Sequence, residues 1–209
     1  MRVLIVDDHQ MFREGLRMLL SIQDNLSVIA DVGNFGDAMR VISEFEVDLA
    51  LLDICMPGRD GVEIIKHGKA IRPNMKVVVV SSFTEPAVVA RVLRADVNGY
   101  VAKQNAAEEV FAAICGVSRG ERYVCDTVAR QLALGMMAAT LGAPAHEKLS
   151  NREFKVMQMV VMGKPGRQIA EELCLSEKTI STHKINVLQK LGLKSTGELV
   201  RYAIDHHLP

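Results

Sequence analysis

Short aliphatic runs alternate with amphipathic stretches along the first 120 residues. The runs lie at residues 3–8, 27–32, 47–53, 76–82 and 98–103, and each has the length of a single strand. Apolar side chains between them recur at helical spacing, as at Ala38, Val41 and Ile42. Near-continuous aliphatic strands that alternate with helices are typical of a parallel sheet buried on both faces. The pattern predicts a doubly wound α/β domain with five strands.

Only helical patterns follow this alternation. Residues 121–145 form an Ala- and Met-rich helical segment that ends in Gly, Pro and Ala, which we interpret as a linker. Ser150 and Glu153 have the spacing of a capping box, Gly163 ends that helix, and Ser176 suits the N-cap of a later one. Four helices are expected, at residues 150–163, 168–174, 176–191 and 197–206. The predicted domains are therefore 1–120, a linker segment over 121–145, and an all-α domain over 146–209.

Composition indicates where the protein is found and how charge is distributed between its two parts. No apolar run approaches the roughly 20 residues that cross a bilayer, and the opening residues do not resemble a signal peptide, so we expect a cytoplasmic protein without membrane contact. The four cysteines have neither C-x-x-C nor paired spacing, which favours reduced, packed thiols. Residues 1–145 carry 15 basic and 18 acidic side chains, and residues 146–209 carry 10 and 7. A net charge of +3 in the second part indicates a module that meets polyanions.

Polar side chains collect where the expected strands end, which is where ligands of open α/β sheets bind. Asp7 and Asp8 end the first strand, Asp53 the third and Ser81 the fourth, and Lys103 follows the fifth. Carboxylates crowded together repel by about 4 kcal/mol per pair at about 4 Å and an effective dielectric constant of about 20, so a cation or a proton must offset them. Oxygen ligands of this kind suit magnesium (Mg²⁺). Asp53 can then attack phosphorus, with Lys103 and Ser81 stabilising the transition state.

The motifs "VDDH", "LLDICMPGRDG", "VVVVSS" and "GYVAK" make residues 1 to about 120 resemble the receiver domain of bacterial two-component response regulators. That resemblance implies a flavodoxin-like fold with Asp53 as phosphoacceptor. It also implies that Asp7, Asp8, Asp53 and the Cys55 carbonyl hold Mg²⁺, that Lys103 pairs with the phosphoryl group, and that Ser81 and Tyr100 form a switch pair.

One position departs from the usual receiver pattern, and two positions that vary within the family bear on hydrolysis. Asp96 stands where the family usually has Gly, which we expect to alter the turn before the fifth strand. Cys55 and Phe83 flank the phosphorylation site, and neither side chain can orient an attacking water. We therefore hypothesise that the acyl phosphate hydrolyses slowly for a receiver.

The second domain resembles the LuxR/NarL-type helix-turn-helix over nearly its whole length. Four lysines and no acid lie from Lys178 to Lys194. At about 100° per residue, Ile180, Val187 and Leu191 fall on one helix face, which packs on the domain, and the other face enters the major groove. The expected DNA-binding residues are Lys178, Thr179, Ser181, Thr182, Lys184, Ile185 and Lys190. Lysines mainly contact phosphates, whereas Ser181 and Thr182 reach base edges and Ile185 suits a thymine methyl group.

The resemblance as a whole implies a transcriptional regulator that is not an enzyme. Its implied partners are a sensor histidine kinase, promoter DNA, RNA polymerase and a second copy of the chain. Phosphorylation would act by changing dimerisation or interdomain contact. Leu199, Tyr202 and Ala203 on the last helix are a candidate dimer surface.

Three rival interpretations remain. An aspartate-based phosphatase also has a nucleophile at a strand end, but it needs a second Asp where Cys55 stands. A flavin- or nucleotide-binding protein would need a Gly-rich phosphate loop, which the segment after Asp8 lacks. The third interpretation keeps DNA binding but makes the first domain a docking module that is never phosphorylated.

Overall fold

The computed structural model describes residues 1–56, 61–139, 145–173, 175–206 and 208. These residues form two compact units, Met1–Leu141 and Gly142–Pro209. The Pro-Gly part of the motif after Asp53, the Gly- and Pro-containing end of the expected linker, and Cys174 at the end of the expected second helix lie outside the described residues. No described helix is long and apolar enough to cross a membrane.

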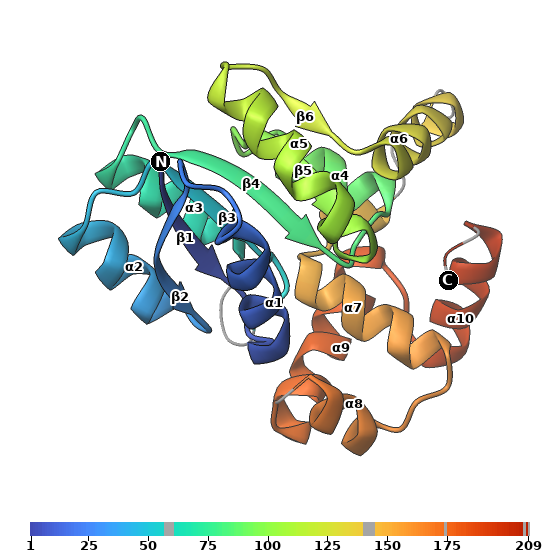
Figure 1. Cartoon of the computed structure of the whole chain (residues 1–209). Coiled ribbons are helices and arrows are strands. Elements are labelled where there is room, and N and C mark those ends of the chain that lie inside the picture. The colour runs from blue at the N-terminus through green and yellow to red at the C-terminus, as the bar shows by residue number, and fades with distance from the viewer. Residues whose placement is uncertain (57–60, 140–144, 174, 207, 209) are drawn as a thin grey trace. The chain divides into compact units, whose positions relative to one another are not determined.

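The first unit contains a single parallel sheet whose described strands number six rather than the expected five (Figure 1). Their order is β2-β1-β3-β4-β5-β6. The strands are β1 Arg2–Val6, β2 Ser27–Val32, β3 Leu49–Leu52, β4 Lys76–Ser81, β5 Gly99–Ala102 and β6 Tyr123–Val124. The two-residue β6 pairs with β5 in the segment that the sequence had assigned to helix and linker. A strand of two residues is too short to show the alternating pattern by which strands are recognised in a sequence. Its pairing with β5 alone identifies β6 as a strand.

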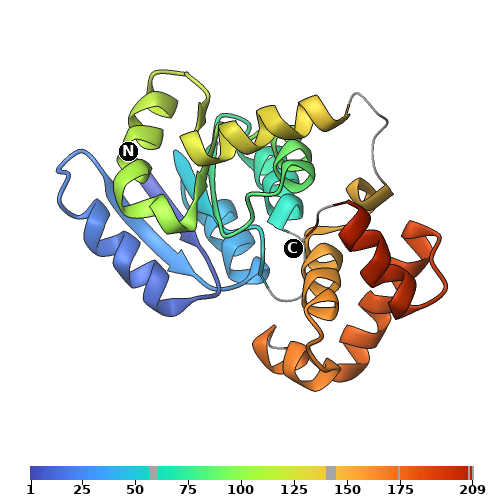
Figure 2. The same cartoon turned by 90° about the vertical axis from the view of Figure 1, so that its right-hand side faces the viewer.

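Helices cover both faces of this sheet, as in a doubly wound fold (Figure 1). They are α1 Gln10–Leu20, α2 Phe35–Glu44, α3 Gly61–Ile71, α4 Pro86–Leu93, α5 Ala106–Ser118 and α6 Asp126–Ala139, with a 3₁₀ turn η1 at Lys103–Asn105. Buried residues of α1 and α5, such as Leu16 and Val110, form one core with Ile5, Leu51 and Val80. The α6 helix packs on α4 and β5 (Figure 2).

Asp96 adopts a left-handed backbone conformation in the turn before β5, with φ of 60°. Glycine adopts this conformation without strain, whereas an L side chain costs roughly 1–2 kcal/mol. The Lys69 ammonium pairs with the Asp96 carboxylate at 2.6 Å and also donates to the Asp96 carbonyl. An aspartate held by Lys69 thus takes here the conformation that suits glycine.

The second unit has four described helices after the 3₁₀ turn η2 at Ala145–Lys148. They are α7 Asn151–Val161, α8 Gly166–Glu172, α9 Glu177–Leu191 and α10 Thr196–Asp205. The capping box is present, since Ser150 accepts from the Glu153 amide and Glu153 accepts from the Ser150 amide. Ser176 caps α9, and Gly192, at φ of 71°, ends it. Buried residues of α7, α8 and α9, among them Val156, Ile169 and Ile180, form the core of the unit.

Candidate functional site

Three carboxylates meet at the carboxyl ends of β1 and β3. Asp7 and Asp8 follow β1, and Asp53 follows β3. Oxygen atoms of all three lie within 4.8 Å of one another and of a ring nitrogen of His9. Asp7 and Asp53 are only 2% and 3% exposed, so their charges require partners inside the protein. The structure thus brings together acids that lie 45 residues or more apart in the sequence.

Lys103 is the cation of this cluster. Its Nζ lies 2.6 Å from Asp7 Oδ2 and 2.7 Å from Asp53 Oδ2. It also lies 4.7 Å from the centre of the Phe12 ring, at a distance suited to a cation–π contact. Burial lowers the pKa of Lys103, but the charges and hydrogen bonds of Asp53 and Asp7 outweigh burial, so the pKa is raised above its ordinary value. Lys103 therefore stays charged. From its position next to β5 its positive charge stabilises the buried carboxylates of Asp7 and Asp53.

Asp8 contributes an oxygen that the protein itself leaves unsatisfied. The His9 Nδ1 atom is 2.9 Å from Asp8 Oδ1, but the hydrogen bond of the ring is directed at Asp7 Oδ1, 3.1 Å away. Asp8 Oδ1 is buried and has no hydrogen-bond partner. Three carboxylates with one ammonium leave a formal charge of −2, the charge that one divalent cation neutralises. The donor set is therefore suited to Mg²⁺, whose preferred ligands are carboxylate and carbonyl oxygens.

The backbone after Asp53 is held against the carboxylate. The amide of Cys55 donates to Asp53 Oδ1 at 3.0 Å, which leaves Oδ2 to Lys103. Gly61 begins α3 directly beside this segment, and a Cβ on Gly61 would lie 2.5 Å from the Ile54 Cα atom. Only a residue without a side chain allows α3 to approach the Asp53–Cys55 backbone so closely.

Ser81 and Tyr100 are the expected switch pair. Ser81 is the last residue of β4, and Tyr100 lies on β5. Both are fully buried. Tyr100 donates its hydroxyl hydrogen to the Phe83 carbonyl at 2.7 Å, and Ser81 Oγ accepts from the Phe83 amide at 3.3 Å. Burial raises the pKa of Tyr100 well above its ordinary range, so its hydroxyl is a hydrogen-bond donor. Both residues therefore bond the same peptide segment, which follows β4.

Three residues beside this acidic cluster were missed from the sequence. They are His9, Phe12 and Arg13, and Arg13 Nη1 donates to the Asp7 carbonyl at 2.6 Å. Each lies on or just before the first turn of α1, directly after the two acids. The available signal was this adjacency, because a helix that begins at the carboxyl end of β1 directs its first turn at the strand ends.

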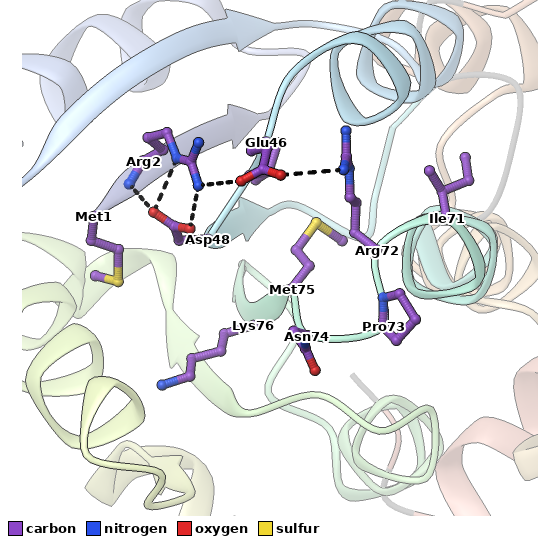
Figure 3. A pocket seen from close by; sticks show the side chains of 11 residues that line it. Met1, Arg2, Glu46, Asp48, Ile71, Arg72, Pro73, Asn74, Met75 and Lys76 are labelled. Carbon is purple, nitrogen blue, oxygen red and sulfur yellow. Dashed lines mark hydrogen bonds and ion pairs between the residues drawn. The ribbon is translucent and has the colours of Figure 1, made fainter.

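A cavity lies elsewhere, next to the start of β1 and β4 (Figure 3). Four of its charged side chains pair with one another, whereas Lys76 donates to the Val117 and Ser118 carbonyls. Arg2 bonds Asp48 at 3.0 Å and Glu46 at 2.8 Å, and Arg72 lies 3.8 Å from Glu46 (Figure 3). These pairs satisfy the charges along its wall and hold β1 to the entry of β3, so we assign the cavity a structural role.

The α9 helix presents a polar face to solvent. Lys178, Ser181, Thr182 and Ile185 are exposed, the last by 55%, whereas Ile180 and Val187 are buried. Lys184 and Thr179 are half-buried. This division is the one expected from the helical spacing.

Three of the expected DNA-binding residues also make contacts within the protein. Thr179 Oγ1 lies 2.8 Å from the oxygen of the N-cap Ser176, and Thr182 donates to the Lys178 carbonyl at 3.0 Å. Lys190 forms a 2.6 Å ion pair with Glu153. The first two contacts lie within α9 and its N-cap, whereas the third fixes the end of α9 to the first turn of α7.

The expected dimer surface on α10 is wrong. Leu199 and Ala203 are completely buried within the second unit, and Tyr202 accepts a hydrogen bond from the His146 amide. The spacing identified an apolar helix face correctly, but this face packs on the domain's own core. The exposed apolar side chain of α10 is Ile204, at 66%.

Both halves of the chain match known protein families. Residues 3–115 match the response regulator receiver domain, and residues 147–203 match the bacterial regulatory proteins of the luxR family. Response regulator UvrY of Escherichia coli is 32% identical over 99% of this chain and 94% of its own length. The transcriptional regulatory protein LiaR of Bacillus subtilis is 32% identical over 99% and 98%.

Solved structures of RcsB are similar to this chain over nearly its whole length. RcsB from Salmonella enterica serovar Typhimurium, bound to promoter rprA in the presence of the phosphomimetic BeF3⁻, matches with a TM-score of 0.64 and 27% identity over 97% of both chains. A structure of two RcsB dimers bound to two parallel DNAs matches with a TM-score of 0.61 and 27% identity over 98% of both chains. The family consists of DNA-binding regulators rather than enzymes. The chain belongs to the two-component response regulators that join a receiver domain to a DNA-binding domain of the luxR family.

Proposed function

We propose that this chain regulates transcription in the cytoplasm through phosphoryl capture at Asp53, which changes how its C-terminal domain binds promoter DNA. In this proposal residues 1–120 are the receiver, 121–145 connect the domains and 146–209 bind DNA. The observation that carries it is the Lys103 ammonium between Asp7 and Asp53, beside a buried Asp8 oxygen without a hydrogen-bond partner. This group keeps a formal deficit of two positive charges.

We assign the metal site to Asp7, Asp8, Asp53 and the Cys55 carbonyl. Bound Mg²⁺ would supply positive charge to the oxygens of an incoming phosphoryl group. The unsatisfied Asp8 oxygen and the formal charge of −2 support this assignment.

Asp53 is the nucleophile of the proposed reaction. Its carboxylate oxygen forms a bond to phosphorus while the bond from phosphorus to the donor's oxygen or nitrogen breaks, and the donor group leaves. The Cys55 amide and Lys103 hold the carboxylate in place. Negative charge develops on the phosphoryl oxygens in the transition state, and Lys103, fixed beside Asp53, stabilises it.

Ser81 and Tyr100 relay the change. The Ser81 hydroxyl, at the end of β4, is proposed to turn to a phosphoryl oxygen and to release the Phe83 amide. Tyr100 bonds the carbonyl of that same residue, so movement of this segment changes the position of the tyrosine. Reversing a 1:99 equilibrium takes about 5.5 kcal/mol of differential binding, which several charge-assisted hydrogen bonds can supply.

DNA is proposed to bind the exposed face of α9. Lys178 and Lys184 would contact phosphates, with Thr179 at the helix start, while Ser181, Thr182 and Ile185 face the bases of the major groove. Lys190 would add its charge at the far end of the helix. Paired half-sites and a homodimer follow from this mode of binding. The solved RcsB dimers on DNA support the homodimer.

A sensor histidine kinase is the proposed phosphoryl donor, and RNA polymerase is a proposed partner at the promoter. The exposed apolar side chains of α1 suit the kinase contact. Met11 and Met18 are 86% and 73% exposed and lie seven residues apart on α1, which begins two residues after Asp8. Ile22, just beyond the end of this helix, is 72% exposed.

Acetyl phosphate with Mg²⁺ tests the proposal. Intact mass should show one added phosphoryl group, which is lost in Asp53→Asn and on chelation of the metal. Lys103→Met keeps the length of the side chain without its charge and should slow labelling strongly. Promoter binding of the wild-type chain should change on phosphorylation, and that of Asp53→Asn should not.

The outcomes separate this function from its rivals. If acetyl phosphate neither labels the wild-type chain nor changes its affinity for the promoter, the first domain is better explained as a docking module that is never phosphorylated. Continuous release of phosphate from small phosphate esters would favour the phosphatase. The bound label should persist, since neither Cys55 nor Phe83 can orient a water, and its loss within seconds at neutral pH would refute slow hydrolysis.

A further inference from the structure

Cys125 lies where β5, the strand that leads into Lys103, meets the start of α6. It is completely buried and carries a free thiol. Its amide donates to the Tyr100 carbonyl at 3.0 Å, which continues the pairing of β6 with β5. Its carbonyl accepts from the Ala129 amide at 2.9 Å and so closes the first turn of α6. The backbone of Cys125 thus connects the residue of the proposed switch to the helix that follows the receiver sheet.

The thiol makes a third contact, with the peptide next to the pocket lysine. Cys125 Sγ accepts from the Ala102 amide at 3.4 Å. Ala102 is 1% exposed, so without this contact its N–H would be a buried donor that water does not reach. Lys103, which directly follows Ala102, lies at hydrogen-bonding distance from both Asp7 and Asp53. A shift of the Ala102 peptide would therefore move the lysine relative to both acids.

We propose that Cys125 is a positioning residue of the receiver: its thiol fixes the Ala102 peptide, and thereby Lys103, while its backbone makes the start of α6 follow β5. The inference rests on the proposed phosphorylation of Asp53 and names the route by which that site reaches the segment between the domains. The α6 helix packs on α4 and β5 (Figure 2). A movement of β5 can therefore reach α6 by two routes, through the backbone of Cys125 and through the side-by-side packing of α6 on β5.

Two substitutions separate hydrogen bonding from packing. Cys125→Val fills the space of the thiol but removes the acceptor. Cys125→Ser keeps an acceptor but is smaller and more polar. If the thiol matters only as an apolar filler, the Val variant will behave better than the Ser variant. If it holds the Ala102 amide, the order is reversed, because a hydroxyl oxygen accepts this hydrogen bond at least as well as sulfur does.

Exchange of the Ala102 amide hydrogen, followed by NMR on the unphosphorylated full chain, gives the first measurement. We expect slow exchange in the wild type and in Cys125→Ser, and exchange about tenfold faster in Cys125→Val. Equal exchange in the Val and Ser variants would overturn the proposal. This measurement does not depend on phosphorylation, so it decides the role of the thiol even if Asp53 takes no phosphoryl group, a result that would contradict the proposed function alone.

Phosphoryl transfer from acetyl phosphate with Mg²⁺ gives the second measurement. Displacement of Lys103 should lower the maximal labelling rate of Cys125→Val about tenfold, with a smaller change in the half-saturating donor concentration, because the lysine acts mainly on charge that develops in the transition state. Cys125→Ser should recover most of the rate. A wild-type rate in Cys125→Val would contradict the positioning of Lys103.

Hydrogen exchange across residues 126–139, before and after phosphorylation, tests the connection to α6. The wild type and Cys125→Ser should show a change in the first turn of the helix on phosphorylation. Fully labelled Cys125→Val should show a smaller change. An unchanged α6 in phosphorylated wild type would refute the proposed route.

Discussion

Lys190 near the end of α9 forms a 2.6 Å ion pair with Glu153 in the first turn of α7. Glu153 is 5% exposed at its side chain and also accepts from the Ser150 amide at 2.7 Å. Burial raises the pKa of Glu153, but the hydrogen bonds of Lys190 and Ser150 outweigh burial, so the pKa lies below its ordinary value. The capping box of one helix thus fixes the far end of α9, the helix proposed to contact DNA.

This pair makes the lysines of α9 unequal toward DNA. Lys178→Ala should reduce the slope of log affinity against log salt by about 1, since an exposed lysine on a phosphate releases about one counterion. Lys190→Ala should reduce it less, because Glu153 already neutralises much of that charge, and should lower the free energy of unfolding by about 1 kcal/mol. Binding isotherms at several salt concentrations measure the slopes. Equal slopes for the two variants would contradict the distinction.

Gly61→Ala should damage the proposed phosphorylation site without replacing any of its polar side chains. The new Cβ would lie 2.5 Å from the Ile54 Cα atom and 2.9 Å from the Asp53 carbonyl oxygen, so the backbone must shift. We expect a loss of about 1–3 kcal/mol in the free energy of unfolding, together with slower labelling by acetyl phosphate. Urea unfolding and intact mass measure the two effects.

Gly15→Ala is the matched control. Gly15 lies within α1, and a Cβ there meets nothing within 4 Å. Alanine favours the helix by up to about 1 kcal/mol, so this variant should be at least as stable as the wild type and should accept phosphate normally. A destabilised Gly15→Ala would show that the contacts of the added Cβ do not explain the result at Gly61.

Asp96→Gly and Asp96→Ala should differ in stability although both lose the bond between the carboxylate and Lys69. Glycine adopts the φ of 60° freely, whereas alanine keeps the strain and lacks the carboxylate that offsets it. We expect Asp96→Ala to be less stable than Asp96→Gly by about 1 kcal/mol, measured by urea unfolding. If the two variants unfold at the same urea concentration, the backbone conformation is not the cause.

His146 should make the second unit less stable in mild acid. It is 8% exposed, and its Nδ1 lies 3.0 Å from the Tyr202 hydroxyl oxygen. Burial, with the nearby His206, lowers the pKa of His146 from 6.5 to about 4. Because the folded pKa is below the unfolded one, the neutral histidine contributes its full stability above pH 6.5, and this contribution is lost as the pH falls toward 4.

Hydrogen exchange of amides in α7 and α10 measures this loss within the full chain. The free energy of opening should fall between pH 6.5 and 4 in the wild type and fall less in His146→Gln, which cannot take up the proton. Parallel curves for the two proteins would exclude His146 as the titrating group.

The order of aliphatic runs and the acids at their ends determined the α/β fold, the pocket and the family, because each buried parallel strand is a continuous apolar segment that shows in the sequence. Asp7, Asp8, Asp53 and Lys103 could be placed together since parallel strands end at one edge of a sheet. The capping box and the exposed face of α9 were equally local, and both were found.

Tertiary structure alone decided which surfaces remain free. Leu199 and Ala203 have the spacing of an interface, but helical spacing shows that a face is apolar and not what covers it. The pairing of β6 with β5 and the ion pair of Lys190 with Glu153 join residues distant in sequence, and no local pattern encodes such a contact. The contact of Cys125 with the Ala102 amide has the same origin, because it exists only where a sixth strand lies beside the fifth.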